Sequence, residues 1–437
     1  MNYTFTAEER KDIIALMNRE IVPAIGCTEP IAVALCVAKA TETLGCRPER
    51  IEARLSANVL KNAMGVGIPG TGMTGLPIAM ALGAIVGRSE YELEVLKDAD
   101  AKAVEEGKKM IEEHRIDVDL KYNITEKLYI EIEVSAGGAS ALAIISGGHS
   151  RFVHVSRCGE TLFSLDAPAS SEGEAPVAEV KDPELSLKKV WDFAMTAPLE
   201  ELEFILEAKR LNMNAAQMSL QGDYGHAIGK LFRAESERNI MGDTLHCQIV
   251  GMTTAACDAR MAGAMIPVMS NSGSGNQGLT STVPVVVYGE QTGASEEQMI
   301  RALILSHLTV IYIKQSLGRL SALCGCVVAA TGSACGITYL MGGDFEEVSG
   351  AVKNMVANLT GMICDGAKPS CSLKVTSGVA TAVLSATLAM NNRVTTSLEG
   401  IIEDNVDNCI RNLTEIGRSG MSETDSLILK IMTSKKS

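Results

Sequence analysis

The sequence is poor in aromatic residues and lacks any run of basic residues. Only 4% of its 437 residues are aromatic, whereas 46% are hydrophobic and 40 are glycine. This composition is typical of a close-packed globular protein built from small side chains and Met rather than from rings. The net charge is -14, and affinity for a phosphate backbone requires clustered Lys and Arg. We therefore expect no nucleic acid partner.

The N-terminus lacks the features of a secretory signal. Its first residues, MNYTFTAEERK, contain no apolar core and no small-residue cleavage site. We therefore expect a cytoplasmic protein, in which twelve cysteines are better explained as thiols and ligands than as disulfides. One uncharged run, residues 320–343, is long enough to cross a bilayer, but it is rich in Gly, Ser, Thr and Cys. We expect a buried core helix there and no membrane partner.

Five of the cysteines are concentrated between residues 323 and 374, among Gly, Ala, Ser and apolar residues. Thiolates are soft ligands that select zinc, copper or iron–sulfur clusters. Cys364 and Cys371 are separated by a segment that contains Gly366 and Pro369. These residues favour a loop over a helix, so the two sulfurs can converge on one point.

A third ligand must come from upstream, where the candidates are Cys324, Cys326 and Cys335. Residues two apart on a helix point about 200° away from each other. Cys324 and Cys326 therefore cannot both face one cluster if that run is helical. The alternative for all these cysteines is that they are small buried hydrophobic residues, because free Cys is among the most buried residue types.

A further cysteine lies in the motif GCTEP near the start of the chain. Residues 31–44 are predicted to be helical, and Thr28 suits the N-cap while Pro30 suits the first turn. Cys27 is then placed just before a helix N-terminus, where the dipole and free N–H groups lower the pKa of a thiol. The alternative is a buried cysteine at a turn.

The motifs GCTEP, LCGCV, SACG and CDGAKPSC resemble those of the L-cysteine desulfidase family. More distantly, the chain resembles the alpha domain of iron–sulfur-dependent L-serine dehydratases. The resemblance runs nearly end to end. It implies a 4Fe-4S cluster held by three cysteines, which by position are Cys324, Cys364 and Cys371. Cys326 and Cys335 are then packing or supporting residues.

The activity implied by the resemblance is β-elimination of L-cysteine to sulfide, ammonia and pyruvate. Three thiolate ligands leave one iron of a four-iron cluster open as a Lewis acid, and Cys27 is implied to be the base that removes the α-proton. The loop between Cys364 and Cys371 is shorter than in the dehydratases, and no cysteine ends the chain, which favours the desulfidase. Alternatives are an L-serine dehydratase, a non-enzymatic iron–sulfur sensor, and a pyridoxal phosphate enzyme with its phosphate cup at residues 270–278.

Two glycine-rich segments are candidate substrate-binding loops, at residues 61–75 and 270–278. Such loops let backbone N–H groups approach an anion, but a tight turn and a flexible surface loop, respectively, are the alternatives. Residues 222–226, GDYGH, are a weaker candidate. The individual candidates for substrate contact or for tuning Cys27 are Thr28, Glu29, Lys61, Asn62, Gly70, Thr71, Gly72, Asn271, Ser272, Gly273, Ser274 and Asn276.

The hydrophobic pattern predicts an α+β fold that is mainly a helical bundle, with an inserted module containing a small antiparallel sheet. Residues 1–88 are expected to pack with the C-terminal half, and residues 89–165 to form the inserted module. Residues 166–184 are expected to be a linker, and residues 185–437 an all-helical domain that carries the cluster. A homo-oligomer is compatible with the sequence, which does not specify one.

Overall fold

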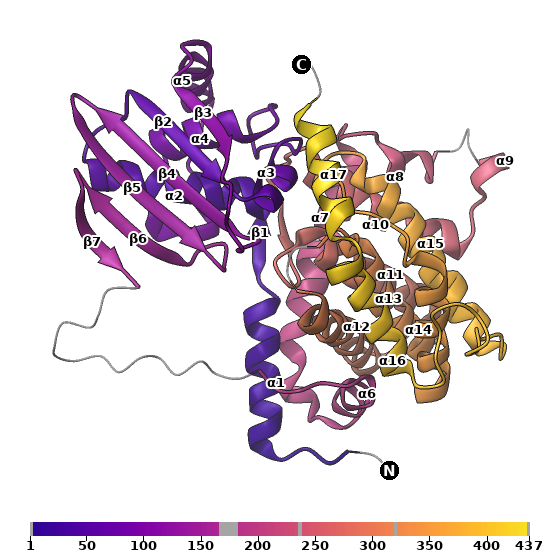
Figure 1. Cartoon of the computed structure of the whole chain (residues 1–437). Coiled ribbons are helices and arrows are strands. Elements are labelled where there is room, and N and C mark those ends of the chain that lie inside the picture. Colours follow the sequence, from indigo (N-terminus) through magenta and orange to yellow (C-terminus); the bar gives the residue numbers. More distant parts are fainter. Residues whose placement is uncertain (1–2, 166–181, 235–237, 319–320, 435–437) are drawn as a thin grey trace. The chain divides into compact units, whose positions relative to one another are not determined.

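The computed structural model describes residues 3–165, 182–234, 238–318 and 321–434 (Figure 1). The chain divides into two compact units, a helical unit of Met1–Cys27 and Leu185–Ser437 and a sheet unit of Thr28–Glu184. Helices and strands are both present, so the predicted α+β class is confirmed. Most of the predicted linker, residues 166–184, lies outside the described residues.

The sheet unit is built on a six-stranded sheet with the order β3-β2-β4-β5-β6-β7. The β2–β3 pair is parallel and the other pairs are antiparallel. The strands are β2 (Arg50–Leu55), β3 (Ile116–Leu120), β4 (Tyr129–Ala136), β5 (Ala139–Ser146), β6 (Phe152–Arg157) and β7 (Glu160–Ser164). Helices α2 (Thr28–Leu44) and α4 (Leu76–Ile85) pack on one face (Figure 1). The remaining elements are α3 (Ala57–Ala63), η1 (Ser89–Glu94) and α5 (Ala101–Glu112).

The sheet unit is larger than the inserted module expected at residues 89–165. Strand β2 is hydrogen-bonded to β3 on one side and to β4 on the other, so residues 28–88 belong with the sheet and not with the C-terminal half. Parallel pairing of β2 with β3 requires a long crossover, which α3, α4 and α5 supply. The sheet is therefore mixed rather than antiparallel.

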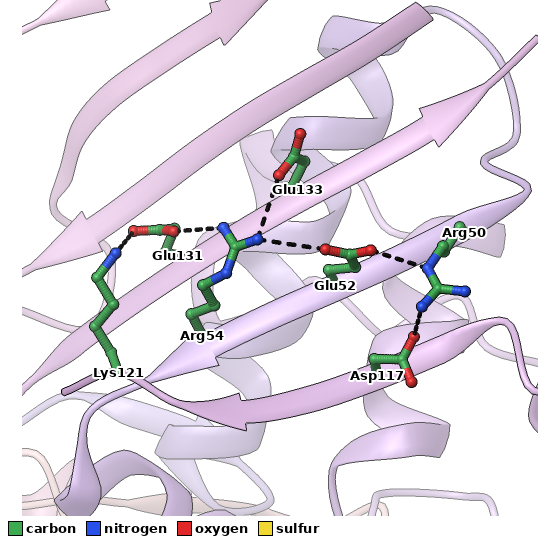
Figure 2. Close-up of polar contacts among 7 residues, drawn as sticks. All are labelled: Arg50, Glu52, Arg54, Asp117, Lys121, Glu131 and Glu133. Carbon is green, nitrogen blue, oxygen red and sulfur yellow. Dashed lines mark hydrogen bonds and ion pairs between the residues drawn. The ribbon is translucent and has the colours of Figure 1, made fainter. Parts of the chain in front are cut away.

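The two faces of the sheet differ because side chains alternate along each strand. On β2, Ile51 and Leu55 are fully buried. Glu52 and Arg54 lie on the opposite face, where they join the network of charged side chains drawn in Figure 2. This alternation is the local sequence signal of a strand with one buried face.

The helical unit is organised around α13 (Gly325–Leu340), which carries no charged residue and contacts four neighbouring helices. The buried helix predicted within residues 320–343 is therefore confirmed. The other helices are α1 (Ala7–Glu20), α6 (Leu187–Thr196), α7 (Leu206–Gln221), α8 (Ile228–Leu231), α9 (Arg238–Met241), α10 (Leu245–Met261), α11 (Gly275–Thr292), α12 (Glu296–Leu317), α14 (Phe345–Leu359), α15 (Cys371–Met390), α16 (Val406–Glu415) and α17 (Ser422–Thr433). Short helical turns are η2 (Leu199–Glu201), η3 (Glu203–Ile205) and η5 (Ile416–Gly420).

The helical unit also contains a two-stranded antiparallel sheet, so the expectation of an all-helical C-terminal half was wrong in this detail. Strand β1 (Pro23–Ile25) pairs with β8 (Pro267–Met269), with Ala24 opposite Val268. The strand that completes the pair comes from the far N-terminal segment, which a local pattern in the C-terminal half cannot reveal.

Within the described part of the chain, one helix, α15, has the length and apolar character that a membrane crossing would need. It packs against α10, α13 and α14. Length and composition alone are weak evidence for a span, because the core helix of a bundle has the same properties.

Candidate functional site

Cys324 and Cys364 are brought together by a short antiparallel bridge between Leu323 and Ile363. Each cysteine directly follows a bridge residue, so both side chains project from the same face of the pair. Cys324 occupies the N-cap position of α13. The two segments are far apart in the sequence, and the bridge is what places their thiols side by side.

Cys371 joins them from the first residue of α15. Burial raises the pKa of Cys324 to about 12, and the neighbouring Cys364 and Cys371 thiols add to that rise. Burial also raises the pKa of Cys371, again with a contribution from Cys364. The structure therefore brings the three cysteines predicted from the resemblance close enough to influence one another's pKa, and we call them the cysteine trio. That they hold a cluster stays a prediction.

Two lysines place positive charge beside the cysteine trio. Lys374 Nζ donates to the Asp365 carboxylate and to the Ile363 carbonyl, the latter at 2.9 Å. Lys368 Nζ lies 2.6 Å from Asp365 Oδ1. Burial alone would raise the pKa of Asp365, but these two lysines hold it at about 2. Burial alone would lower the pKa of Lys374, yet Asp365 and the cysteine thiols raise it.

The donor set fits an iron–sulfur cluster. All twelve cysteines are free of disulfides, and two of the trio lie at helix N-termini, where the main-chain N–H of Cys326 lowers the pKa of Cys324. Among the described residues, no three His, Cys, Asp or Glu side chains gather as a group for a single metal ion. Each thiolate of a four-iron cluster binds a different iron, so its ligands stand further apart than those of one ion.

Cys326 and Cys335 lie on α13 with their thiols in the protein core. The Cys326 thiol donates to the Lys374 carbonyl at 3.2 Å, and a Cβ placed on Gly378 would lie 2.4 Å from its Sγ. Burial raises the pKa of Cys335 to about 12. Cys326 therefore packs α13 against α15, which agrees with the supporting role expected for it.

Cys257, a fully buried residue of α10, was not predicted from the sequence. Its pKa is raised well above its usual value by burial and by the nearby Cys371 thiol. Cys257 has no short spacing to another cysteine. Only the packing of α10 on α15 places it beside the site.

The predicted loop at residues 270–278 is shorter than expected, because residues 275–278 form the first turn of α11. Residues 270–272 are buried and residues 273 and 274 are half-buried, so the alternative of a flexible surface loop was wrong. Asn271 Nδ2 donates to the His307 carbonyl at 3.1 Å, and Ser272 Oγ donates to Asn271 Oδ1 at 2.8 Å. Ser272 and Gly273 have positive φ values of 49° and 78°. Asn271 and Ser272 thus use their side-chain polar groups to hold the loop, which leaves them poorly suited to a phosphate cup.

The first turn of α11 brings further polar groups toward Cys324. Ser274 caps this helix by accepting from the Gln277 N–H, and the Gln277 side chain lies against Gly325, where an added Cβ would be 3.1 Å from its Cδ. Arg260 of α10 donates from Nη1 to Asn276 Oδ1 at 3.0 Å. Arg260 and Gln277 are buried. Neither was predicted as a site residue, because no local sequence pattern marks it.

The weaker candidate at residues 222–226 also lies near the site. A Cβ on Gly225 would be 3.7 Å from Asp258 Oδ1 and also 3.7 Å from Pro369 Cβ. Pro369 belongs to the loop between Cys364 and Cys371. The carboxylate of Asp258 accepts from the Gly229 N–H at 3.0 Å. Burial raises the pKa of Asp258 above its ordinary value.

Cys27 lies directly before α2, as predicted. The helix begins at Thr28, so Cys27 rather than Thr28 stands at the position before the first helical residue. Cys27 is the last residue of the helical unit and Thr28 the first of the sheet unit. The convergence of Cys27 with the cysteine trio stays a prediction.

Four candidates in the sheet unit are buried polar residues of α2 and α3. Asn62 Nδ2 donates to Glu29 Oε1 at 3.0 Å, and the Lys61 side chain is 1% exposed. Thr28 and Glu29 open α2 and are buried as well. A role in binding substrate or in tuning Cys27 stays a prediction for these residues.

The loop with Gly70, Thr71 and Gly72 has the geometry of a tight turn. Thr71 Oγ1 donates to the Ile68 carbonyl at 2.8 Å and accepts from the Met73 N–H at 3.0 Å. Gly70 and Gly72 have φ values of 73° and 65°, which glycine adopts without strain. The hydroxyl of Thr71 is satisfied inside its own loop, so the turn alternative accounts for these three residues.

Known proteins resemble this chain over nearly its whole length. Residues 90–430 match the family model described as the serine dehydratase alpha chain. A UPF0597 protein of Bacteroides fragilis is 66% identical over 430 residues, which is 98% of this chain and 99% of the relative. UPF0597 proteins of Porphyromonas gingivalis and Aeromonas hydrophila are 53% and 43% identical, each over 97% of this chain and over 98% and 96% of their own lengths.

Proposed function

We propose, from the premise that this chain belongs to the serine dehydratase alpha-chain family, that it catalyses β-elimination of L-cysteine to sulfide, ammonia and pyruvate. Membership of the family indicates a lyase-type enzyme, and the family is commonly iron–sulfur dependent. The finer assignment to L-cysteine rests on the GCTEP and cysteine motifs of the sequence. The proposed location is the cytoplasm, where reducing conditions keep the cysteines as thiols.

One observation carries the proposal. The bridge between Leu323 and Ile363 joins the segment of Cys324 to that of Cys364, and Cys371 opens α15 at the end of the same loop. Two lysines lie beside them. These three cysteines would hold a 4Fe-4S cluster. When bound, the cluster supplies a Lewis-acidic iron that makes sulfide a better leaving group.

Cys27 is the proposed general base. It directly precedes α2, and the positive end of a helix favours a thiolate beside it. The thiolate takes the α-proton, the C–H electron pair forms the Cα–Cβ double bond, and the Cβ–S bond breaks with its pair on sulfur. The resulting aminoacrylate tautomerises to an imine, which water hydrolyses to pyruvate and ammonia.

Lys374 and Lys368 supply positive charge to a site that gathers several thiols. Lys374 is also tied to the loop of the paired cysteines through Asp365 and the Ile363 carbonyl. We propose that it holds this loop in the conformation that cluster binding requires. Ser274 and Asn276, at the N-terminus of α11, are the loop residues that remain candidates for contact with substrate.

L-serine is the second candidate substrate, because the matching family model is that of a serine dehydratase. The same base and the same carbon atoms are used, and only the leaving atom differs. The relative rates of pyruvate formation from L-cysteine and L-serine therefore show which of them is the preferred substrate. A non-enzymatic sensor would bind the cluster through the same thiols and form no product.

Anaerobic reconstitution with iron and sulfide tests the proposal. Purified protein is assayed with L-cysteine and L-serine side by side, with sulfide and pyruvate measured together. We expect equal amounts of sulfide and pyruvate from L-cysteine, and slower pyruvate formation from L-serine. A faster reaction with L-serine would identify a dehydratase, and a loaded cluster without either product would identify a sensor.

A matched pair of cysteine variants tests the ligand set. Cys364→Ala should lose most of the bound iron and all product formation. Cys335→Ala removes a buried thiol from α13 that lies outside the cysteine trio, so it should keep both. Iron retained in Cys364→Ala at the level of the native protein would remove the basis of the proposal.

A further inference from the structure

Buried polar atoms without partners occur where α10 ends and α11 begins. Among the described residues, Arg260 Nε and Gln277 Oε1 make no hydrogen bond, and neither does Thr280 Oγ1, one turn after Gln277. Arg260 is 4% exposed and Gln277 3%. Buried polar groups in proteins are nearly always paired, so a donor and an acceptor left open together indicate a ligand that offers the opposite groups.

This group of atoms lies beside the cysteine trio. Gln277 packs on Gly325, the residue that follows Cys324. Arg260 lies near the end of α10, which packs against α15, the helix that begins at Cys371. Two separate packing contacts therefore connect the ends of α10 and α11 to the site.

The first two residues of α11 add main-chain donors. The N–H groups of Gly275 and Asn276 have no acceptor within the helix, and the positive end of the helix dipole lies there. A Cβ on Gly275 would lie 2.2 Å from Arg260 Nε, so the guanidinium rests directly against this turn. A side chain at Gly275 would displace the guanidinium from this turn.

An α-amino acid carries an anionic carboxylate and a cationic ammonium on one carbon. A guanidinium is planar, permanently charged and suited to bidentate binding of carboxylate. An amide oxygen is a neutral hydrogen-bond acceptor, and an ammonium group donates to it readily. The carboxylate matches Arg260 and the N-terminus of α11. The ammonium group matches Gln277, in the first turn of that helix.

We propose that Arg260 and Gln277 form the recognition site for the zwitterionic head of an α-amino acid, with the carboxylate on Arg260 and the ammonium on Gln277 Oε1. The direction of the substrate's β-carbon toward the cysteine trio rests on the proposed function. Head-group binding itself does not require turnover. Asn271 and Ser272 have a different task, because their polar groups hold the loop.

Equilibrium binding of L-alanine to the reconstituted protein tests the proposal, because L-alanine has the head group but no leaving group. Measured by calorimetry, native protein should bind L-alanine at least about tenfold more tightly than propionate or ethylamine, which each lack one charge. Arg260→Gln should weaken L-alanine binding at least about tenfold. Gln277→Ala should weaken L-alanine binding but leave the affinity for propionate unchanged.

The control is Arg210→Gln, which removes an exposed guanidinium from α7 and should leave all affinities unchanged. Equal affinity of native protein for L-alanine and propionate would overturn the proposal, and so would an unchanged L-alanine affinity in Arg260→Gln. If Arg260→Gln fails to fold, the ligand series on native protein and Gln277→Ala still decide. If L-alanine binding depends on Arg260 but L-cysteine gives no sulfide, the proposed binding site is supported and only the proposed reaction is refuted.

Discussion

The main chains at Cys324 and Cys364 are hydrogen-bonded into one antiparallel bridge. The Cys324 N–H donates to the Met362 carbonyl at 3.0 Å, and the Cys364 N–H donates to the Ala322 carbonyl at 2.6 Å. The backbone bonds therefore fix how far apart the main chains of these two cysteines lie. A site whose ligands are placed by main-chain bonds is preorganised, and the protein has less left to order when it binds a cofactor.

Lys374→Met should accelerate the loss of iron from reconstituted protein by about tenfold, the lower end of the range for groups that support metal ligands. The substitution removes the anchor that joins α15 to Asp365 and the Ile363 carbonyl, and it removes a positive charge near the trio. Iron release to a chelator under anaerobic conditions measures the rate. Lys430→Met, at an exposed position of α17, is the control, and equal rates for both variants would contradict the role of Lys374.

Gly378→Ala should lower the free energy of unfolding by about 1–3 kcal/mol, the usual cost of overpacking a core. The added Cβ would lie 2.4 Å from Cys326 Sγ and 3.4 Å from Ala330 Cβ. Urea denaturation measures the change, and the exposed neighbour Ser377→Ala should change little.

Combining Gly378→Ala with Cys326→Ala supplies a sharper test of this contact. The smaller side chain removes the clash, so the double variant should be more stable than the sum of the two single effects predicts. Strict additivity would show that the cost of Gly378→Ala arises elsewhere than at the Cys326 thiol.

Local chemistry in the sequence was sufficient to predict parts of the site. Gly366 and Pro369 prevent a helix between Cys364 and Cys371, and the segment is a loop that ends where α15 begins. Pro30 falls in the first turn of α2, so Cys27 precedes a helix as expected. These features depend on residues a few positions apart, which is the range over which caps and turns act.

Long-range packing decided the rest. Arg260 and Gln277 belong to helices that are buried on nearly every side, so no amphipathic pattern indicates which side chains turn toward the cysteines. Cys257 is adjacent to Asp258 but distant in sequence from every other cysteine near the site. The sheet boundary was misplaced for a similar reason, because the pairing of Ile51 with Ile116 joins segments on either side of three helices.

Glu131→Gln should lower the free energy of unfolding by about 1–3 kcal/mol, the cost of leaving buried donors unpaired. Its carboxylate accepts from Arg54 at 2.8 Å, Lys121 at 2.7 Å and the Tyr129 hydroxyl at 2.6 Å; the two ion pairs are drawn in Figure 2. Burial alone would raise the pKa of Glu131, but these three donors lower it. Glu133→Gln on the same strand is the control, because Glu133 is 41% exposed with a 3.7 Å contact to Arg54.

The pH dependence of the Glu131 contribution follows from the lowered pKa. Stabilisation by the carboxylate is complete above its unfolded pKa of about 4.3 and is lost as the pH falls toward the folded value. Urea denaturation of native protein and Glu131→Gln should therefore differ most near neutral pH and converge in acid. A difference that persists unchanged in acid would assign the effect to shape rather than charge.

His307 should also make the protein less stable as the pH falls, but as a base that stays neutral in the folded state. It is fully buried, with Nδ1 3.1 Å from Asn271 Nδ2 and Nε2 2.9 Å from Thr282 Oγ1. Asn271 donates to Nδ1, so the proton is on Nε2 and Thr282 accepts it. Burial lowers the pKa of His307 to about 3, far below the value of about 6.5 expected in an unfolded chain.

Between those two pKa values the unfolded chain binds a proton that the folded His307 does not. The free energy of unfolding therefore falls as the pH is lowered through this window, by up to about 1.4 kcal/mol per pH unit, and His307 contributes no slope above about pH 6.5. Urea denaturation between about pH 7 and pH 5 should show this slope in the native protein and lose it in His307→Gln. His114→Asn, at an exposed site with a positive φ of 53° that Asn tolerates, should keep the slope. An identical slope in native protein and His307→Gln would mean that His307 is protonated within the folded core, and the donor assignment toward Asn271 and Thr282 would then be wrong.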